Sequence, residues 1–316
     1  MAFLKKTVPW LIVLATFYYL FKKYPLDQVI QAARHINFSL FISYSITYFV
    51  FMWIVDCWSL ARLFSRFGSS TLVREVMPVR LATYLIMVLN YSAAQGVFAY
   101  FFKRAKQVSF SKSSSLILFI TIIDLYWTIT LAFIGSCLAS PLVQGHQLSY
   151  LISIIWSAAT AGLISLNFFW KLPAHWKLMQ WLQKRELFHA FHQANIKDYL
   201  FTMITRLPMH LAVNTIFYFV AFSFGAHLPF VKVIMYLPII ILIGALPITP
   251  GGLGTTQLAA VEFFQNDIQG KIIDQGLVTP AELLLAMSLA FVFFNYFLKA
   301  LSGSFFLKKA TNYAKS

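Results

Sequence analysis

The sequence predicts an all-α, polytopic membrane protein. Three observations predict this fold class: hydrophobic residues make up 59% of the 316 residues, charged residues make up only 11%, and the mean hydropathy is +0.72. A water-soluble domain has roughly a quarter of its residues charged, so this chain cannot cover a water-facing surface of ordinary size. We therefore expect most of the protein to be solvated by a bilayer.

About six stretches are apolar enough to be full membrane-spanning helices, which need about 20 apolar residues each. In chain order they are Val8–Phe21, Leu40–Leu60, Ser115–Leu138, Leu148–Trp170, Tyr199–Phe224 and Leu283–Leu307. The first is short and follows Lys5 and Lys6, as the apolar part of a secretory signal does. It ends in Phe21-Lys22-Lys23-Tyr24 without a small-residue cleavage site. We interpret it as an uncleaved first span.

Two further apolar stretches are interrupted. Val79–Phe102 contains the polar segment Asn90–Gly96, and Phe230–Phe264 contains Pro247-Ile248-Thr249-Pro250-Gly251-Gly252-Leu253-Gly254. The second interruption has two prolines and three glycines in eight residues, a density that cannot continue a helix. Both stretches are therefore predicted to be helix pairs joined by a break.

The distribution of Lys and Arg predicts how these stretches meet the membrane, because cytoplasmic loops are enriched in both. The segment 171–197 and the C-terminal Lys308, Lys309 and Lys315 are basic, so we place them inside. Gln144–Ser149 lacks basic residues and Gln265–Glu282 is acidic on balance, so we place both outside. Basic residues flank the first broken stretch on both sides: Arg62, Arg66, Arg74, Arg80, Lys103, Arg104, Lys106 and Lys112. Lys22, Lys23 and Arg34, in the first outside loop, depart from the pattern.

This topology works only if both broken stretches are re-entrant and enter from opposite sides. The order is then span, span, re-entrant hairpin, span, repeated with inverted orientation. The predicted halves of this single membrane domain (1–316) are residues 1–139 and 148–307, and the second half contains the basic cytoplasmic connector 171–197. Paired broken segments in inverted halves locate the substrate path in transporters. The repeat rests on hydropathy and charge, without residue-level identity between the halves.

Two local patterns predict peripheral structure. Thr279-Pro280-Ala281-Glu282 has the residues of a helix start with a capping box. His175–His192 mixes aromatic and basic residues, so it is either an amphipathic helix on the cytoplasmic leaflet or an ordinary basic loop.

The glycine-rich break is the first candidate site. Gly251, Gly252 and Gly254 would let backbone N–H groups approach a ligand closely, and a helix starting near Thr255 would point its positive end at the same space, which suits a phosphate. The alternative is a kink whose glycines serve only close packing. The density of glycine and proline favours a site.

Charged residues inside apolar stretches are the second candidate, because such groups are costly in lipid and usually face a partner or a cavity. Asp124 is the deepest. Arg206 lies near a span start, with His210 one turn later, whereas Asp56 either pairs with nearby groups such as Arg62 or faces a cavity. We interpret Lys299 as an anchor at the cytoplasmic interface.

Several functions are disfavoured. The chain has no nucleotide-binding loop, no dinucleotide-binding glycine pattern and no metalloprotease or serine-hydrolase motif, so we expect no enzyme activity, no cofactor and no metal. The net charge of +15 comes from basic residues scattered between apolar runs, which disfavours nucleic-acid binding. Cys57 and Cys137 lie within apolar runs and are expected to act as small hydrophobic residues.

The break at Leu246–Gly254 resembles the Pro-x-x-Pro-Gly-Gly-x-Gly element of the lysylphosphatidylglycerol synthase transmembrane-region family, also called the flippase-like domain family. The first half resembles the family more loosely, through Asn90, Gln95-Gly96, Lys103-Arg104, Ser111–Ser115 and Asp124. The resemblance covers most of the chain. It implies the movement of lipids with large polar or anionic headgroups across the inner membrane, such as aminoacylated phosphatidylglycerol, polyprenyl-phosphate-linked sugars or hopanoid-type lipids.

One departure concerns energy coupling. Relatives often have an acidic residue shortly after the glycines, whereas this chain has Gln257 there and Gln95 at the comparable position of the first half. An amide still hydrogen-bonds a headgroup but does not carry a proton.

These observations predict a flippase or scramblase for an anionic or large-headgroup lipid in the bacterial cytoplasmic membrane, with both termini cytoplasmic. The alternatives are a non-transporting partner that presents lipid to a separate glycosyl- or aminoacyl-transferase, and a lipid-modifying enzyme using Asp124 with His210. The lipid, the direction of transport and the oligomeric state stay open. The predicted headgroup path consists of Asn90, Gln95, Gly96, Arg104, Asp124, Arg206, Pro247, Thr249, Pro250, Gly251, Gly252, Gly254 and Gln257.

Overall fold

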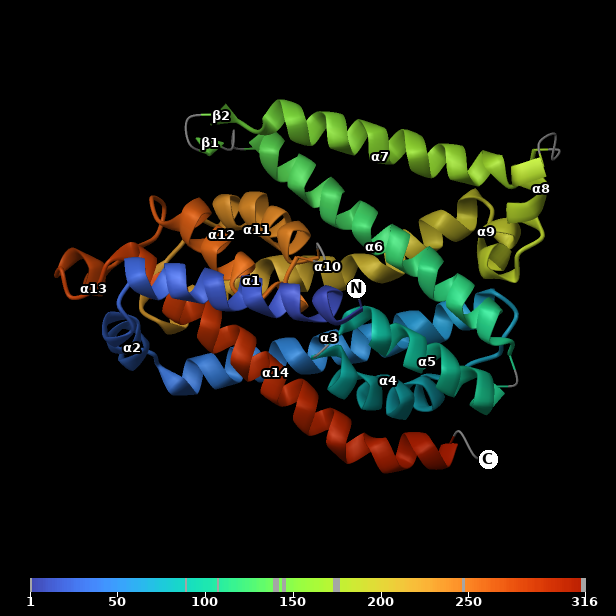
Figure 1. The fold of residues 1–316 in the computed structure, drawn as a ribbon, viewed down its shortest axis with the longest axis horizontal. Coiled ribbons are helices and arrows are strands. Elements are labelled where there is room, and N and C mark those ends of the chain that lie inside the picture. Colours follow the sequence, from blue (N-terminus) through green and yellow to red (C-terminus); the bar gives the residue numbers. More distant parts are fainter. Residues whose placement is uncertain are drawn as a thin grey trace. The chain divides into compact units, whose positions relative to one another are not determined.

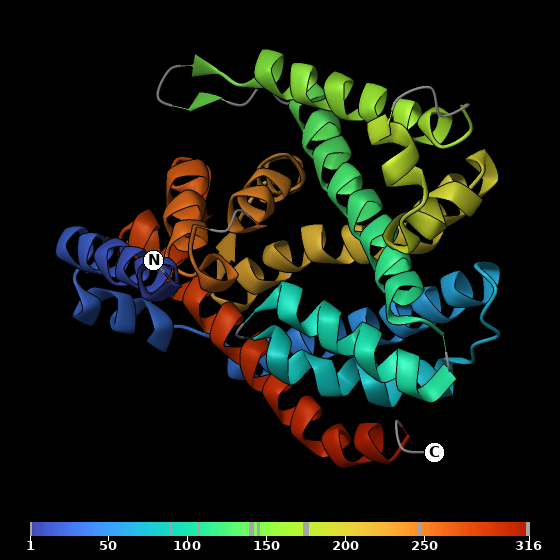
Figure 2. The same ribbon diagram turned by 45° about the vertical axis from the view of Figure 1, so that its right-hand side comes forward.

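The computed structural model describes residues 2–88, 90–106, 108–138, 142–143, 146–172, 177–245 and 248–313, and helices dominate them (Figures 1 and 2). The longer helices are α1 (Ala2–Lys23), α3 (Phe38–Arg66), α4 (Val73–Met87), α5 (Tyr91–Lys106), α6 (Phe110–Leu138), α7 (Ser149–Phe169), α10 (Ile196–Ser223), α11 (Phe230–Ala245), α12 (Thr255–Phe264) and α14 (Pro280–Tyr313). The shorter ones are α2 (Leu26–Arg34), α8 (Lys177–Gln183), η1 (Glu186–Phe188), α9 (His189–Gln193), η2 (Pro250–Gly252) and α13 (Lys271–Asp274).

Four helices are long and apolar enough to cross a membrane among the residues that the structure describes: α3, α6, α7 and α14. α6 shows why, because its sequence from Leu116 to Cys137 is almost entirely apolar and carries a single charged residue, Asp124. The all-α membrane class predicted from composition is therefore confirmed. The number of spans stays a prediction.

The chain divides into two compact units. Unit 1 consists of Met1–Val50, Thr128–Ile154 and Leu211–Phe297, and unit 2 consists of Phe51–Trp127, Ile155–His210 and Leu298–Ser316. Five helices, α3, α6, α7, α10 and α14, contribute residues to both units. The units therefore draw on both of the predicted sequential halves, 1–139 and 148–307, and the inverted repeat itself stays a prediction.

Unit 1 has a core of aliphatic and aromatic side chains around Phe224, Met235 and Phe264. Gly135 lies so close to Met235 that a Cβ at position 135 would overlap its backbone, which shows how tightly α6 and α11 pack here. Two short antiparallel pairs join loops: β1 (Leu142–Val143) with β2 (His146–Gln147), and β3 (Ala226–His227) with β4 (Gln269–Gly270). Within this unit α11 and α12 pack as a helical hairpin, and α1 packs on α12.

Unit 2 has a more aromatic core. The rings of Phe64 and Phe102 lie 4.1 Å apart, and Phe98 and Phe119 are fully buried nearby. Here α4 and α5 pack side by side as the second hairpin, drawn in cyan and blue-green (Figures 1 and 2). Both interrupted stretches predicted from the sequence thus fold as pairs of short helices.

Two local predictions have clear outcomes. The capping box is confirmed, because the Thr279 N–H donates to Glu282 Oε2 at 2.7 Å and the Glu282 N–H donates to Thr279 Oγ1 at 3.3 Å. A single amphipathic helix over His175–His192 is wrong. Residues 173–176 lie outside the described residues, and the rest forms α8, η1 and α9, because Arg185 adopts extended backbone angles.

Candidate functional site

A buried carboxylate, Asp56 on α3, is the centre of a charged network in unit 2. Its Oδ2 accepts a hydrogen bond from Arg80 Nε on α4 at 2.5 Å, and its Oδ1 accepts one from Arg206 Nη1 on α10 at 2.8 Å. The hydroxyl of Tyr84, one turn after Arg80, donates to Oδ2 at 3.3 Å. The Asp56 side chain is only 2% exposed, so these partners are what make burial of its charge tolerable.

Arg206 extends the network to a second carboxylate. Its Nε and Nη2 donate to the two oxygens of Asp124 on α6, at 2.8 and 2.7 Å. This two-point arrangement is the strongest geometry available to a guanidinium and a carboxylate. His210, one turn after Arg206 on α10, places Nε2 3.1 Å from Asp124 Oδ1. Arg206 is thus held from both sides by carboxylates.

Two further helices of unit 2 reach the same network. Arg80 Nη1 donates to Gln95 Oε1 on α5 at 3.1 Å. Lys299 on α14 is half-buried and lies within electrostatic reach of Arg80 and Asp56. Gly303, one turn after Lys299 on α14, packs closely on α4. A Cβ at position 303 would lie 2.7 Å from Leu85 Cβ. A close contact between α4 and α14 therefore lies one turn from Lys299.

Local capping fixes the hairpin that supplies Arg80 and Gln95. Glu75 Oε2 accepts the Leu72 N–H at 2.7 Å at the start of α4. Asn90 Oδ1 accepts the Ala93 N–H at 2.8 Å at the start of α5. Such caps supply partners for N–H groups that a helix start leaves unpaired. Asn90, predicted to contact a headgroup, has a structural role in starting α5.

The network is unevenly exposed. Asp56 lies at its closed end, whereas the Asp124 side chain is 18% exposed. Asp124 is also the middle residue of α6, a helix of 29 residues. A charge there lies near the centre of a long apolar helix, where it is expensive without partners. The network therefore places ionised groups among long apolar helices, with one end more exposed than the other.

Sequence reasoning found part of this network and missed part. It singled out Gln95, Asp124 and Arg206, and the structure brings them together. It missed Arg80, which it assigned to the cytoplasmic flank. The predicted apolar stretch begins at Val79, so Arg80 lies inside it. This position could have identified Arg80 as a charged residue within an apolar segment.

The structure shows the surroundings of three further residues that the sequence singled out. Asp56 pairs with Arg80 and Arg206, while Arg62 is exposed. Lys299 lies within α14, is half-buried and is within electrostatic reach of Arg80 and Asp56; its assignment as an anchor at the membrane interface stays a prediction. Arg104, predicted to lie on the headgroup path, is exposed near the end of α5, where its Nη2 donates to Tyr100 at 3.4 Å.

The glycine-rich break lies in unit 1 between α11 and α12. Gly251, Gly252 and Gly254 have φ values of +61°, +73° and +82°, a region that other residues enter at a cost. Close contacts add to this requirement, since a Cβ on Gly252 would lie 2.8 Å from Gly244 Cα. Glycine at these positions is therefore explained by backbone conformation and by packing.

Three N–H groups of the break have partners within it or at the start of α12. The Gly252 and Leu253 N–H groups donate to the carbonyls of Thr249 and Pro250, both at 3.2 Å. The Gly254 N–H donates to the side-chain Oε1 of Gln257 at 2.7 Å. The prediction that these amides hold a phosphate therefore requires the loop to give up its internal hydrogen bonds.

The other predicted residues of the break are also engaged locally. The hydroxyls of Thr249 and Thr255 lie 3.1 Å apart, and the Gly251 carbonyl accepts a hydrogen bond from Tyr296 on α14 at 3.3 Å. Pro250 begins the short helix η2. Gly96, the remaining glycine of the prediction, lies within α5 with open space around it. Pro247 lies outside the described residues.

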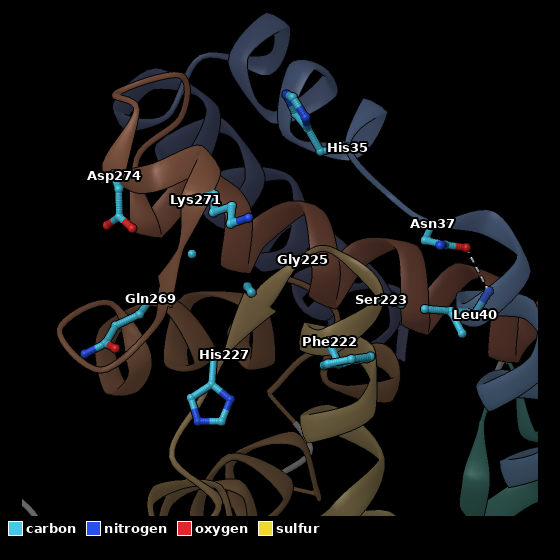
Figure 3. Close-up of a pocket in the computed structure, with 12 residues that line it drawn as sticks. His35, Asn37, Leu40, Phe222, Ser223, Gly225, His227, Gln269, Lys271 and Asp274 are labelled. Atoms are coloured by element: carbon cyan, nitrogen blue, oxygen red, sulfur yellow. Dashed lines mark hydrogen bonds between the residues drawn. The ribbon is translucent and has the colours of Figure 1, made fainter.

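Unit 1 also has a cavity of about 580 Å³ beside the β3–β4 pair. Figure 3 shows His35 and Asn37 on one side and Lys271, Asp274 and His227 on the others. Asn37 is already used, because its Oδ1 accepts the Leu40 N–H at 3.1 Å. Among the described residues that line it, the cavity lacks the interlocking ion pairs of unit 2, so the charged network is the stronger candidate site.

The fold and the network together define a multi-pass α-helical membrane protein with ionised side chains buried among its helices. The chain belongs to the family described as the lysylphosphatidylglycerol synthase TM region, whose model matches residues 7–266. The matched region includes the charged network up to His210 and the glycine-rich break. Comparisons with curated proteins and with solved structures gave no significant match.

Proposed function

We propose that this protein moves a lipid with an anionic or large polar headgroup across the bacterial cytoplasmic membrane, as a flippase or scramblase. The observation that carries the proposal is the network of Asp56, Arg80, Asp124 and Arg206 within apolar helices. Ionisable groups at membrane depth usually mark the path of a substrate or an ion. Such a path lets a headgroup cross while the acyl chains stay in lipid.

The short helix pairs support a path built from re-entrant segments. α4, α5 and α11 have 15 or 16 residues, which corresponds to about 24 Å and falls short of the roughly 30 Å hydrocarbon layer. Non-helical backbone at this depth needs protein or water around it. In the proposed topology α4–α5 enters from the cytoplasm, α11–α12 enters from outside, and both termini are cytoplasmic.

The proposed substrate class follows from the chemistry of the network and from the family. A guanidinium fork that holds a carboxylate also matches a phosphate, and phosphate is shared by aminoacyl-phosphatidylglycerol and polyprenyl-phosphate-linked sugars. The description of the family names lysylphosphatidylglycerol, which is a phospholipid. This supports a phospholipid as the substrate. No catalytic role is assigned to any residue in this proposal.

Two alternatives rest on specific observations. The network is internally paired, which suits a partner subunit that holds lipid for a separate transferase without moving it. The hydrogen bond between His210 and Asp124 suits an acid–base pair, and thus a lipid-modifying enzyme. The enzyme alternative predicts a change of lipid mass on incubation with the pure protein.

The test is translocation of fluorescently labelled phosphatidylglycerol in vesicles containing the purified full chain, followed by dithionite quenching of the outer leaflet. The wild-type protein is expected to accelerate translocation at least about tenfold over empty vesicles, as a path that shields the headgroup charge requires. Arg206→Gln is expected to remove most of that acceleration, because the charge at the centre of the network is lost.

Arg66→Gln is the control in the same unit, since the Arg66 side chain is 37% exposed and pairs with Asp198, which is buried, instead of with Asp56 or Asp124. Its rate should stay within about twofold of wild type, as expected for the loss of an exposed guanidinium. Arg104→Gln gives a second variant at an exposed position where folding is not at risk, and it should slow translocation if the path opens beside α5. Wild-type protein that moves no lipid would reject the flippase proposal and favour the partner subunit.

A further inference from the structure

We infer that the cavity beside the β3–β4 pair in unit 1 binds the headgroup of a phospholipid whose phosphate carries a hydroxyl-bearing group such as glycerol. The inference rests on the proposed lipid function and adds a second site, at which the lipid docks on the outer side of the proposed topology. Three features carry it: the position of the cavity, the hydrogen-bonding side chains of its wall and the lysine among them.

The cavity lies at the end of a long apolar helix. Asn37 directly precedes α3, a candidate membrane span, and its N–H donates to the carbonyl of Ser223, the last residue of α10, at 2.7 Å. This hydrogen bond joins the start of α3 to the end of α10, and both residues line the cavity. Since the headgroup layer begins where the apolar part of a span ends, the proposed topology places the cavity at the level of the headgroups.

Three loops that the proposed topology places outside contribute to the wall. His35 follows α2, His227 lies on β3 and Gln269 lies on β4. His227 is directly opposite Gln269 in the strand pair, so the two side chains share one face. The strands approach closely because position 270 is glycine, where a Cβ would lie 3.0 Å from the carbonyl oxygen of Gly225. The strand pair thus presents an imidazole beside an amide.

The wall is rich in side chains that both donate and accept hydrogen bonds, as a ligand with hydroxyl groups requires. They are the imidazoles of His35 and His227 and the amides of Asn37 and Gln269. The Asn37 Oδ1 accepts the Leu40 N–H at 3.1 Å, so a ligand would meet its NH₂ group. The volume of about 580 Å³ falls in the range of roughly 300–1,000 Å³ that is typical of small-ligand sites.

Lys271 supplies the positive charge that a phosphate needs. It begins α13 and Asp274 ends it, and both residues are exposed and line the cavity. Neither forms an ion pair with another residue that the structure describes, and Figure 3 shows the two side chains leaving α13 in different directions. An ammonium binds phosphate as a point charge, while a carboxylate accepts hydrogen bonds from hydroxyl groups. A ligand with both groups therefore fits this wall better than a purely anionic one.

An apolar edge favours a lipid over a free polyol phosphate. Phe222, near the end of α10, is 55% exposed, and Leu40, in the first turn of α3, is partly exposed. Both line the cavity. A lipid can place its headgroup among the polar side chains while its acyl chains leave past Phe222 and Leu40 into the bilayer.

The inference also gives a reason for basic residues on the outer side. Cytoplasmic loops are normally the ones enriched in Lys and Arg, yet Arg34 lies in the first outside loop of the proposed topology and Lys271 in the last. Arg34 directly precedes His35 of the wall, and Lys271 belongs to the wall itself. Positive charge at this end of unit 1 attracts an anionic headgroup.

The experiment measures the acetylation rate of individual lysines in the detergent-solubilised full chain, using an N-hydroxysuccinimide ester of acetate and peptide mass spectrometry. With dihexanoylphosphatidylglycerol at about ten times its dissociation constant, the rate at Lys271 should fall about tenfold, because only the unoccupied fraction reacts. Lys22 is the control in the same sample, since it is exposed at the end of α1 in the same unit and does not line the cavity. Its rate should not change.

Gln269→Ala tests the hydrogen-bonding wall. The lipid concentration that gives half protection of Lys271 should rise about fivefold, as the loss of one hydrogen bond requires. Gln275→Ala is the matched control, because Gln275 is exposed directly after α13 and does not line the cavity; it should keep the wild-type value. If Gln269→Ala fails to fold, the protection of Lys271 in the wild-type protein still decides the inference.

Two further ligands test the assigned chemistry. Dihexanoylphosphatidylcholine, which has a phosphate but no hydroxyl group and no net charge, should protect Lys271 only at concentrations at least about tenfold higher, because it loses several hydrogen bonds. Glycerol 3-phosphate should also be weaker, because it buries no acyl chain. Equal protection by the choline lipid would overturn the assignment to a hydroxyl-bearing headgroup. Equal protection by glycerol 3-phosphate would make the cavity a site for a soluble phosphate and overturn the assignment to a lipid.

The outcomes separate this inference from the function on which it rests. A Lys271 rate that is the same with and without phosphatidylglycerol would overturn the docking site, and translocation by the wild-type protein would still support the flippase proposal. Protection of Lys271 in a protein that moves no lipid would support the docking site and reject the flippase proposal.

Discussion

The two units place polar groups among apolar helices by different means. Unit 2 contains 18 of the Lys and Arg residues and five of the Asp and Glu residues, and it joins several of its charged and polar side chains into one network. Unit 1 contains seven basic and five acidic residues, and its polarity lies in the backbone of the break between α11 and α12. A side-chain network depends on partners far away in sequence, whereas a glycine-rich break depends on its own few residues. The two should therefore respond differently to substitution.

The largest effect is expected from Asp56→Asn. This change leaves Arg80 and Arg206 buried with one carboxylate fewer between them, and breaking a buried ion pair from one side costs about 3–5 kcal/mol. The free energy of unfolding in mixed micelles, followed by circular dichroism during titration with SDS, should fall by that amount.

The matched control for this loss is Asp267→Asn in unit 1. Asp267 lies 3.6 Å from Lys232 with both side chains partly exposed, and such pairs contribute at most about 1 kcal/mol. The double variant Asp56→Asn with Arg80→Gln should recover part of the stability, because it removes the excess positive charge. Equal losses at Asp56 and Asp267 would mean that the network does not stabilise unit 2.

Much of the fold could be predicted because a helix that is solvated by a bilayer requires a long run of apolar residues. The predicted span Leu40–Leu60 lies within α3, and Tyr199–Phe224 matches α10 to within a few residues. The break at Pro247–Gly254 was visible because proline and glycine act locally on the backbone. Such signals need no knowledge of tertiary contacts.

The network was only partly predictable, because its pairs are long-range. Asp56 and Arg206 are separated by 150 positions. The sequence around either residue does not identify the other as its partner. The short sequence distance between Asp56 and Arg62 suggested a pairing that the structure does not contain. Arg80 was assigned to the membrane surface because other basic residues surround it, although α4 carries it inward.

An intermediate effect is expected from Gly252→Ala in unit 1. The new Cβ would lie 2.8 Å from Gly244 Cα and 2.9 Å from Thr256 Cγ2, at a φ of +73°. Left-handed backbone and overpacking together cost about 2–4 kcal/mol. Thermal unfolding in detergent should shift down accordingly.

Gly96→Ala in unit 2 is the matched control for that substitution. Gly96 is helical with nothing within 4 Å of its added Cβ, and alanine stabilises a helix by about 0.5–1 kcal/mol relative to glycine. Opposite signs at the two positions would confirm that glycine is required by the break and tolerated in α5. A loss at Gly96 as large as that at Gly252 would contradict the distinction between the units.

The smallest effect is expected from Gln257→Leu, which removes the acceptor of the Gly254 N–H at the start of α12. The buried N–H loses its partner, at a cost of about 1–2 kcal/mol. Gln257→Glu keeps an acceptor at the positive end of the helix and should lose less stability than the leucine variant. Equal losses would mean that the side-chain oxygen does not hold the break together. Gln257→Glu is also expected to slow translocation of labelled phosphatidylglycerol more than about tenfold, as repulsion between the new carboxylate and an anionic headgroup would require. A stable variant with that loss would show that Gln257 contacts the headgroup, as the sequence predicts, whereas an unchanged rate would exclude the contact.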